Sequence, residues 1–497
     1  MSFLRKTLKA TAITLGLLTI ACSLLWYKFS DDISPEIKWH ADNVLHGRTG
    51  LLGDLTTGEL IRYIKLRMER RTNVEAVFLP TLNWLQSKIE QPIPPGPLST
   101  FGKGQQTKSM PMLAGQTFSA DLFPNSAEAI ARAMNTAQAG QTILIEPGTY
   151  RFDQKIQTKF SGSATQPITV RASKPGQVII DFQSVEGFLV SQPHWIFENL
   201  AIRGICKWHK DCEHAFHIVG NAHHTVIRNN LIVDFNAHIK VNGVGKQWPD
   251  NGVVESNTIT NSGPRETHLP ITPIDLVGAS NWQIYDNVIS HFIKTEGDKT
   301  SYGVFMKGGG SGGRIERNLI ACTLKDISQP GARIGLSFGG GTTGEKFCRN
   351  ERCNAEHTEG VAANNIIAYC NDFGIDINRS ENITVAHNTL INTAGIDLRG
   401  SQSTANNYGN LLAGQILLRH GSRATNSMNS IADSALKLDP ESDNAISWKV
   451  EPTAIPRIPQ VSLDFCGQVR ASSTSPGAVV ALKNCPCLLN PVSTLPP

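Results

Sequence analysis

The chain has 497 residues, of which 18% are charged, and its formal net charge is +4 at pH 7. This charged fraction lies below the roughly 25% of an ordinary globular protein, and the small net charge argues against nucleic acid as a partner. A chain of this length is longer than a typical compact domain, but an elongated repeat protein can include all of these residues in a single body.

The N-terminal segment has the pattern of a membrane anchor. Arg5 and two lysines precede an apolar run from Thr11 to Tyr27. This run is at the short end for a membrane span and long for the core of a cleaved signal. Cleavage and lipidation at Cys22 are the alternatives. We expect an uncleaved single-pass anchor in the cell membrane, with the N-terminus cytoplasmic and a periplasmic or extracellular body.

Composition and pattern divide the chain into five expected parts. A capping box at Thr56-Thr-Gly-Glu59 and a second helix start near Pro80 predict a short helical hairpin. A Pro-rich run then indicates a stiff linker. In chain order the parts are an anchor (1–32), a helical stalk (33–91), a linker (92–115), a repeat body (116–440) and a Cys-containing C-terminal cap (441–497).

The body carries a repeat that is marked by an Asn before a short apolar run, as in Asn318-Leu-Ile-Ala321. The Asn recurs at Asn199, Asn230, Asn257, Asn287, Asn318, Asn365, Asn388, Asn410 and Asn429. Subtracting successive positions gives 31, 27, 30, 31, 47, 23, 22 and 19 residues. Such a repeat of short strands predicts an all-β solenoid, a right-handed single-stranded parallel β-helix with stacked Asn amides. A helix from Asn125 to Ala139 should cover its first coil.

The cysteines agree with export, because local pairs form disulfides in an oxidising compartment. Cys206/Cys212 and Cys348/Cys353 are close enough in sequence to pair. The run from Cys348 through Cys353 to His357 also fits metal ligands. We favour the disulfide because export is expected.

Two early segments carry a family resemblance. They are Ala139-Gly-Gln-Thr-Ile-Leu-Ile-Glu-Pro-Gly-Thr-Tyr150 and Gly162-Ser-Ala-Thr-Gln-Pro-Ile-Thr-Val170. Both resemble the opening coils of the chondroitinase B and alginate lyase family of polysaccharide lyases, which implies a right-handed parallel β-helix. Later passages, among them Phe305-Met-Lys-Gly-Gly-Gly310 and Glu356-His-Thr-Glu-Gly360, resemble a group of membrane-linked β-helix proteins. This second resemblance implies the fold and no activity.

The lyase resemblance also implies residue roles. The family uses a lysine base, which Lys307 matches, and an arginine about one coil later. One coil later this sequence reads Leu336-Ser-Phe-Gly339, and Arg333 is the nearest arginine. The family binds calcium through acidic residues before the lysine. Glu296 and Asp298 are the candidates here, and calcium is the one cofactor that the resemblance implies.

Strand alternation predicts which polar side chains leave the core. The outward side chains form a mixed row of cations, carboxylates and imidazoles, and successive strands stack at about 4.8 Å. The expected substrate-binding residues are His217, Lys240, Asn242, Asp275, Ser337, Asp376 and Asn378. Arg333 is expected beside Lys307. Lys307 or His238 is the expected base for elimination at a uronate.

These features favour an exported, membrane-anchored β-helix protein that acts on acidic polysaccharide, with lyase- or epimerase-like chemistry. The alternative is a non-catalytic glycan-binding or envelope-scaffold protein, in which the same row is a solvated ladder of alternating charge. Hydrolysis would need two carboxylates at a defined separation, and Asp275 and Asp376 are the candidates.

Overall fold

The computed structural model describes residues 78–82, 104–106, 122–323, 331–340, 343–349, 351–412, 414–431, 436–438, 446–448 and 453–480. The expected anchor lies outside these ranges and stays a prediction. No helix within them is long and apolar enough to cross a membrane. Of the expected helical hairpin, residues 78–82 are described, and they are helical.

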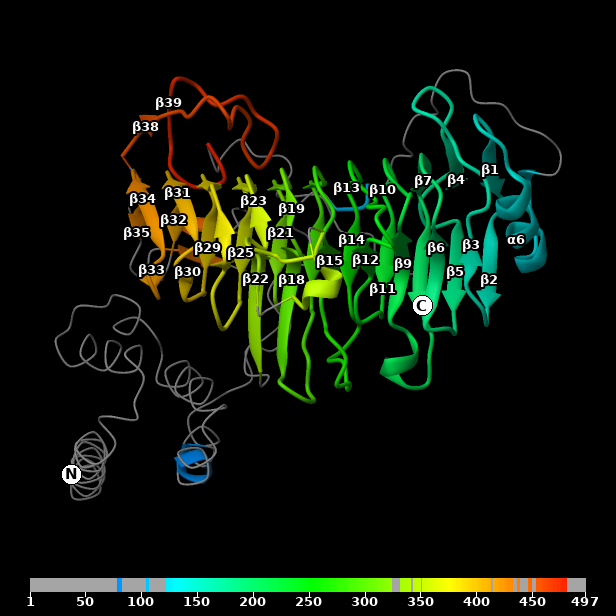
Figure 1. The fold of residues 1–497 in the computed structure, drawn as a ribbon, viewed down its shortest axis with the longest axis horizontal. Coiled ribbons are helices and arrows are strands. Elements are labelled where there is room, and N and C mark those ends of the chain that lie inside the picture. The colour runs from blue at the N-terminus through cyan, green and yellow to red at the C-terminus, as the bar shows by residue number, and fades with distance from the viewer. Residues whose placement is uncertain are drawn as a thin grey trace, which may run out of the picture. The chain divides into compact units, whose positions relative to one another are not determined.

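The body is a parallel β-helix in which successive coils contribute strands to three sheets, of eleven, eleven and ten strands in the described residues (Figure 1). The first sheet contains β1 (Thr142–Ile145), β4 (Ile168–Ala172), β7 (Trp195–Glu198), β10 (Val226–Arg228), β13 (Val253–Glu255), β16 (Gln283–Tyr285), β20 (Arg314–Glu316), β24 (Val361–Ala363), β28 (Ile383–Ala386), β31 (Thr404–Tyr408) and β34 (Arg423–Ser427).

The second sheet follows the first in every coil. It contains β2 (Gly148–Phe152), β5 (Val178–Phe182), β8 (Ala201–Gly204), β11 (Leu231–Val233), β14 (Thr258–Thr260), β17 (Val288–Ser290), β21 (Leu319–Ala321), β25 (Ile366–Ala368), β29 (Thr389–Ile391), β32 (Leu411–Leu412) and β35 (Ser430–Ile431).

The third sheet completes each coil. It contains β3 (Ile156–Gln157), β6 (Glu186–Val190), β9 (His214–Val219), β12 (Ile239–Asn242), β15 (Ile274–Val277), β18 (Thr300–Lys307), β22 (Ala332–Phe338), β26 (Ile375–Asn378), β30 (Gly395–Arg399) and β33 (Gln415–Arg419). Its longest strands, β18 and β22, pair side by side in the middle of the body (Figure 1).

Smaller elements complete the described chain. A short sheet of β19 (Gly310–Ser311), β23 (His357–Thr358) and β27 (Ser380–Glu381) connects the third sheet to the first. Two 3-10 turns, η3 (His209–Asp211) and η4 (Glu345–Phe347), lie in loops. Two hairpins near the C-terminus pair β36 (Leu436–Leu438) with β37 (Ile446–Trp448) and β38 (Ile455–Pro456) with β39 (Ser473–Thr474).

The expected capping helix is α6 (Ala127–Thr136), which lies beside β1–β3 at one end of the coils (Figure 1). Ser126 caps it by accepting a hydrogen bond from the backbone N–H of Ala129 (3.1 Å). Its Ile130 and Met134 are fully buried and join the apolar core. The helix therefore covers the first apolar layer, which a solenoid must protect from water.

The core is made of apolar columns that run along the stack. In the second sheet one inward column is fully buried and consists of Ile202, Ile232, Ile259, Ile289, Ile320 and Ile367. β-Branched side chains suit this packing because they fit a pleated surface. The predicted all-β solenoid is confirmed.

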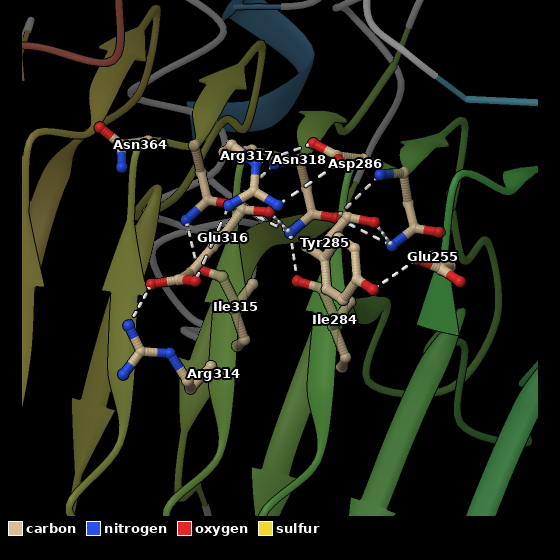
Figure 2. A network of polar contacts seen from close by, with 12 residues as sticks. Glu255, Ile284, Tyr285, Asp286, Arg314, Ile315, Glu316, Arg317, Asn318 and Asn364 are labelled. Atoms are coloured by element: carbon tan, nitrogen blue, oxygen red, sulfur yellow. Dashed lines mark hydrogen bonds and ion pairs between the residues drawn. The ribbon is translucent and has the colours of Figure 1, made fainter. Parts of the chain in front are cut away.

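The repeating Asn residues form the predicted amide ladder at the turn from the first sheet to the second. Asn318 Oδ1 accepts hydrogen bonds from the backbone N–H (3.0 Å) and the side chain (3.0 Å) of Asn287. Its Nδ2 donates to the carbonyl of Ile284 (2.9 Å) and to Asn365 Oδ1 (3.0 Å). Figure 2 shows Asn318 among these contacts. The ladder satisfies buried turn groups that would otherwise lack partners.

Both predicted local disulfides, Cys206–Cys212 and Cys348–Cys353, are present. The metal alternative for Cys348 and Cys353 is therefore wrong. A third disulfide that the sequence did not suggest, Cys322–Cys370, joins two successive coils. Cys466 is also disulfide-bonded.

Two segments outside the coils pack on the body. Within the expected linker, Gln105 is buried and donates from its backbone N–H to Thr258 Oγ1 (3.0 Å) on the second sheet. Near the C-terminus, the buried Arg470 donates to Asn364 Oδ1 (2.6 Å), 106 residues earlier in the chain. Figure 1 shows this C-terminal segment beside the last coils. Its role as an end cap stays a prediction.

Candidate functional site

The outward side of the third sheet collects most of the predicted site residues. One row runs across successive coils in register and consists of His217, Lys240, Asp275, Phe305, Ser337, Asp376 and Asp397. A second row, two residues further along each strand, includes Asn242, Lys307, Asn378, Arg399 and Arg419. We call these two rows together the third-sheet face.

Two lysines converge on one carboxylate at the centre of this face. Asp275 is buried, and Lys240 donates to its Oδ2. Lys307 Nζ lies 3.6 Å from Asp275 Oδ1 and 4.0 Å from the centre of the Phe305 ring. Burial alone would raise the pKa of Asp275, but the two lysines lower it to about 2. These three residues carry one more positive than negative charge, and the carboxyl group of Glu213 also interacts electrostatically with Lys240.

A second cluster, three coils further on, is balanced in charge. Arg399 Nε lies 3.1 Å from Asp376 Oδ1, and Arg419 pairs with Asp397. Asp376 also accepts a hydrogen bond from Ser337 Oγ (2.9 Å). Both carboxylates are buried, and burial raises the pKa of Asp376 to about 6.

A histidine and a glutamate form a third cluster toward the N-terminal end of the face. His217 Nδ1 lies 2.6 Å from Glu186 Oε1, and its Nε2 lies 2.8 Å from Asn242 Oδ1. Lys155 Nζ lies 2.7 Å from the other oxygen of Glu186. Burial opposes ionisation of Glu186, but the hydrogen bonds from Lys155 and His217 lower its pKa. Glu186 was not predicted. Aligning the inward Phe188 with Phe216 places Leu189 opposite His217 and Glu186 opposite His214, so no sequence signal pointed to this contact.

The disulfide loop after β22 packs on the glycine turn that follows Lys307. The backbone N–H of Arg349 donates to the carbonyl of Gly308 (2.8 Å), and Glu356 accepts from the N–H of Gly308 (3.0 Å). Arg349 also pairs with Asp250 (2.6 Å) and thereby ties the loop to an earlier coil. The loop therefore occupies the space beside the glycine turn on this side of Lys307.

Arg333 was expected beside Lys307, but the structure places it elsewhere on the third sheet. It stands in register with Ser301, six residues before Lys307 on β18, and it is buried. At about 3.3 Å per residue, this offset places the two backbones far apart along the strand direction. Arg333 therefore cannot act with Lys307 on one sugar.

The prediction that His238 leaves the core is also wrong. The residue is fully buried just before β12, and its Nε2 lies 2.9 Å from the carbonyl of Thr260. Burial lowers the pKa of His238 to about 3, so the ring is neutral at physiological pH. A side chain without solvent access cannot take a proton from a polymer, so His238 is not a base.

The two expected calcium ligands have other partners. Glu296 lies 3.6 Å from His268, and Asp298 lies 2.7 Å from Lys294. In the part of the chain that the structure describes, no three His, Cys, Asp or Glu side chains gather in a metal-binding arrangement. The placement of Glu296 and Asp298 therefore does not favour a calcium site.

Comparison with known proteins agrees with this fold. Residues 112–267 match the family model described as the Pel9A-like right-handed β-helix region. The crystal structure of pectate lyase Pel9A superimposes with a TM-score of 0.51 at 15% identity, covering 70% of this chain and 90% of that chain. The alginate lyase from Paenibacillus sp. str. FPU-7 gives a TM-score of 0.44 at 15% identity, over 62% and 98%. No curated protein matches. The predicted distant resemblance to β-helix polysaccharide lyases is confirmed.

Proposed function

We propose that the protein acts on an acidic polysaccharide, which binds along the third-sheet face. The observation that carries this proposal is the convergence of Lys240 and Lys307 on the single carboxylate of Asp275. One carboxylate cannot neutralise two ammonium groups, so this part of the face attracts a further anion. Both lysine side chains are partly exposed. The negatively charged carboxylate of a uronate would complement the positive charge of Lys240 and Lys307.

The proposed chemistry is lyase- or epimerase-like. Both reactions begin with loss of the C5 proton of a uronate, which becomes easier when a cation neutralises the sugar carboxylate. Lys307 already pairs with Asp275, so we assign it to carboxylate binding and not to proton abstraction. This assignment departs from the role that the family resemblance implies for Lys307. The pectate lyase with a similar fold supports the class of substrate.

Hydrolysis by the predicted carboxylate pair is not supported. Asp275 and Asp376 are separated by three steps of the third sheet, from β15 through β18 and β22 to β26. At about 4.8 Å for each step this is about 14 Å. Glycosidases hold their two carboxyl groups at about 5–9.5 Å. Asp376 is also buried and bound by Arg399.

A non-catalytic glycan-binding or envelope-scaffold protein is the second candidate. The feature that favours it is the pairing of charges at Asp376 and Asp397, whose side chains are 1% and 0% exposed. A polymer can contact Arg399 and Arg419 there without meeting any group that exchanges protons.

A panel of uronate polymers separates the two candidates. The soluble part, from about Ser99 onward, should be incubated with polygalacturonate, alginate and chondroitin sulfate while absorbance from new unsaturated ends is followed. Turnover supports the lyase proposal, and new uronate epimers seen by NMR without absorbance support an epimerase. Binding without either supports the second candidate. Absence of binding to all three contradicts the proposed function.

Export and membrane anchoring are part of the proposal. Disulfides persist in oxidising compartments, so the Cys206–Cys212, Cys322–Cys370 and Cys348–Cys353 bridges support a periplasmic or extracellular body. A reporter that is active only outside the cytoplasm, fused after Asp32, should be active. Activity of a cytoplasm-only reporter at the same position would contradict this topology.

A further inference from the structure

The proposed function leaves the proton-transfer group unassigned, because His238 is buried and Lys307 is paired with Asp275. On the described part of the third-sheet face, His217 is the histidine in register with Lys240 of the next coil. Its side chain is 19% exposed, so it is shielded but not sealed from solvent. An imidazole is the side chain best suited to exchange protons near neutral pH.

We propose that His217, held by Glu186, is the acid–base residue that acts on a uronate polymer at this face. Glu186 lies 2.6 Å from His217 Nδ1 and fixes the ring, so that Nε2 is the nitrogen left for substrate. Asn242 Oδ1, an acceptor, lies 2.8 Å from Nε2. A bound sugar has to displace this amide, and Nε2 has to be free of a proton, before it can act as the base. The inference rests on the proposed function.

The charges around His217 suit a reaction in which the ring gains and then loses a proton. Glu186 on β6 stabilises an imidazolium. Glu213 and His214 precede His217 on its own side of the coil, and the His214 ring centre lies 5.1 Å from that of His217. Burial raises the pKa of Glu213 and lowers that of His214 to about 4, so His214 adds no positive charge at neutral pH. Lys240 supplies the adjacent cation.

The elimination step balances with this one group. His217 Nε2 takes the C5 proton, and the electron pair of the C5–H bond forms the C4=C5 double bond. The C4–O4 bond breaks, and its electron pair stays on O4. The imidazolium returns the proton to O4, which restores neutral His217. Lys240, the cation in register with His217, neutralises the carboxylate of the reacting sugar throughout, while Lys307, three sheet steps from His217, binds the carboxylate of another sugar of the polymer. Neither an oxidant nor a reductant is needed.

The test compares His217→Gln and Glu186→Gln with the wild type and with His223→Gln. His223 is a half-buried histidine in the turn between β9 and β10, outside the third-sheet face, so it is a matched control. Turnover of polygalacturonate and alginate is measured between pH 5 and 8 by absorbance, and affinity by calorimetry. Melting temperatures confirm that each variant is folded.

His217→Gln should lower kcat by about 10²- to 10⁴-fold while the Kd changes less than about threefold. It should also abolish the pH dependence of the remaining kcat, and Glu186→Gln should lower kcat by a smaller factor. His223→Gln should behave as the wild type. A folded His217→Gln variant with full turnover overturns the assignment, as does a loss confined to affinity. Absence of turnover by the wild type overturns the catalytic function itself.

Discussion

Cys322 and Cys370 form a disulfide between two successive coils, one and two residues after the ends of β21 and β25. Both side chains are fully buried. The bridge spans 48 residues of sequence, and this stretch includes the Cys348–Cys353 loop that packs on Gly308. The disulfide therefore closes the base of the longest insertion between two repeats.

Removal of this disulfide should cost more stability than removal of the local one. By the chain-entropy relation, a loop of this length contributes about 4 kcal/mol, and the Cys348–Cys353 loop contributes about 2 kcal/mol. The double variants Cys322→Ala/Cys370→Ala and Cys348→Ala/Cys353→Ala should be compared by urea unfolding. Equal losses would contradict the view that the long bridge holds the insertion.

The amide ladder should be essential to the stack. Asn318→Ala removes the acceptor of the Asn287 backbone N–H and the donor to the Ile284 carbonyl, both of them buried. Buried groups without partners cost about 1–3 kcal/mol each, so we expect a loss of at least about 2 kcal/mol in urea unfolding. The exposed Asn406 on β31 provides a control, and Asn406→Ala should change stability by less than about 0.5 kcal/mol. A similar effect of both substitutions would contradict this role.

The ladder and the coils could be predicted because they depend on local repeats. Each Asn precedes an apolar strand, and strand alternation fixes which side chains face inward. The same rule placed His217, Lys240, Asp275 and Lys307 on one face, and the structure brings them together. The third-sheet face follows from alternation although the spacing varies, from 23 residues between His217 and Lys240 to 35 between Lys240 and Asp275, because alternation depends on the strand and not on the length of the loop before it.

The prediction failed where a contact depends on the position of a residue along its strand or on an insertion between two coils. β18 and β22 pair with Leu336 opposite Val304, so Ser301 and not Lys307 stands opposite Arg333. Cys322 and Cys370 could not be paired from spacing alone, because the insertion between them separates residues that adjacent coils bring together. His238 was misplaced because the alternation rule was applied to it although it lies one residue before β12, outside the strand.

Asp376 should make stability depend on pH. Burial raises its folded-state pKa from the usual 3.8 to about 6, so the folded protein binds the proton more tightly than the unfolded chain. Stability contributed by this group is present below about pH 4 and is lost as the pH rises to about 6. The unfolding free energy of the wild type minus that of Asp376→Asn should therefore fall over this range. A difference that stays constant would contradict the raised pKa.

The different roles of the two lysines at Asp275 can be tested by comparing the stability of two variants. Lys307→Ala leaves Lys240 bound to Asp275, so the buried carboxylate keeps a partner and the melting temperature should change little. Lys240→Ala should be the more destabilising substitution, because Lys240 makes the direct hydrogen bond while Lys307 lies 3.6 Å away. Thermal unfolding of the two variants compares them, and the reverse order would contradict this division of roles.

The most direct measurement is the affinity of Lys307→Ala for the uronate polymer that the wild type binds most tightly, determined by calorimetry. The exposed Lys174, in the turn between β4 and β5, is the matched control for lost charge. Lys307→Ala should weaken binding at least about tenfold, which corresponds to about 1.4 kcal/mol, and Lys174→Ala should leave it unchanged. Equal weakening by both variants, or none by Lys307→Ala, would contradict an acidic-polysaccharide site on the third-sheet face.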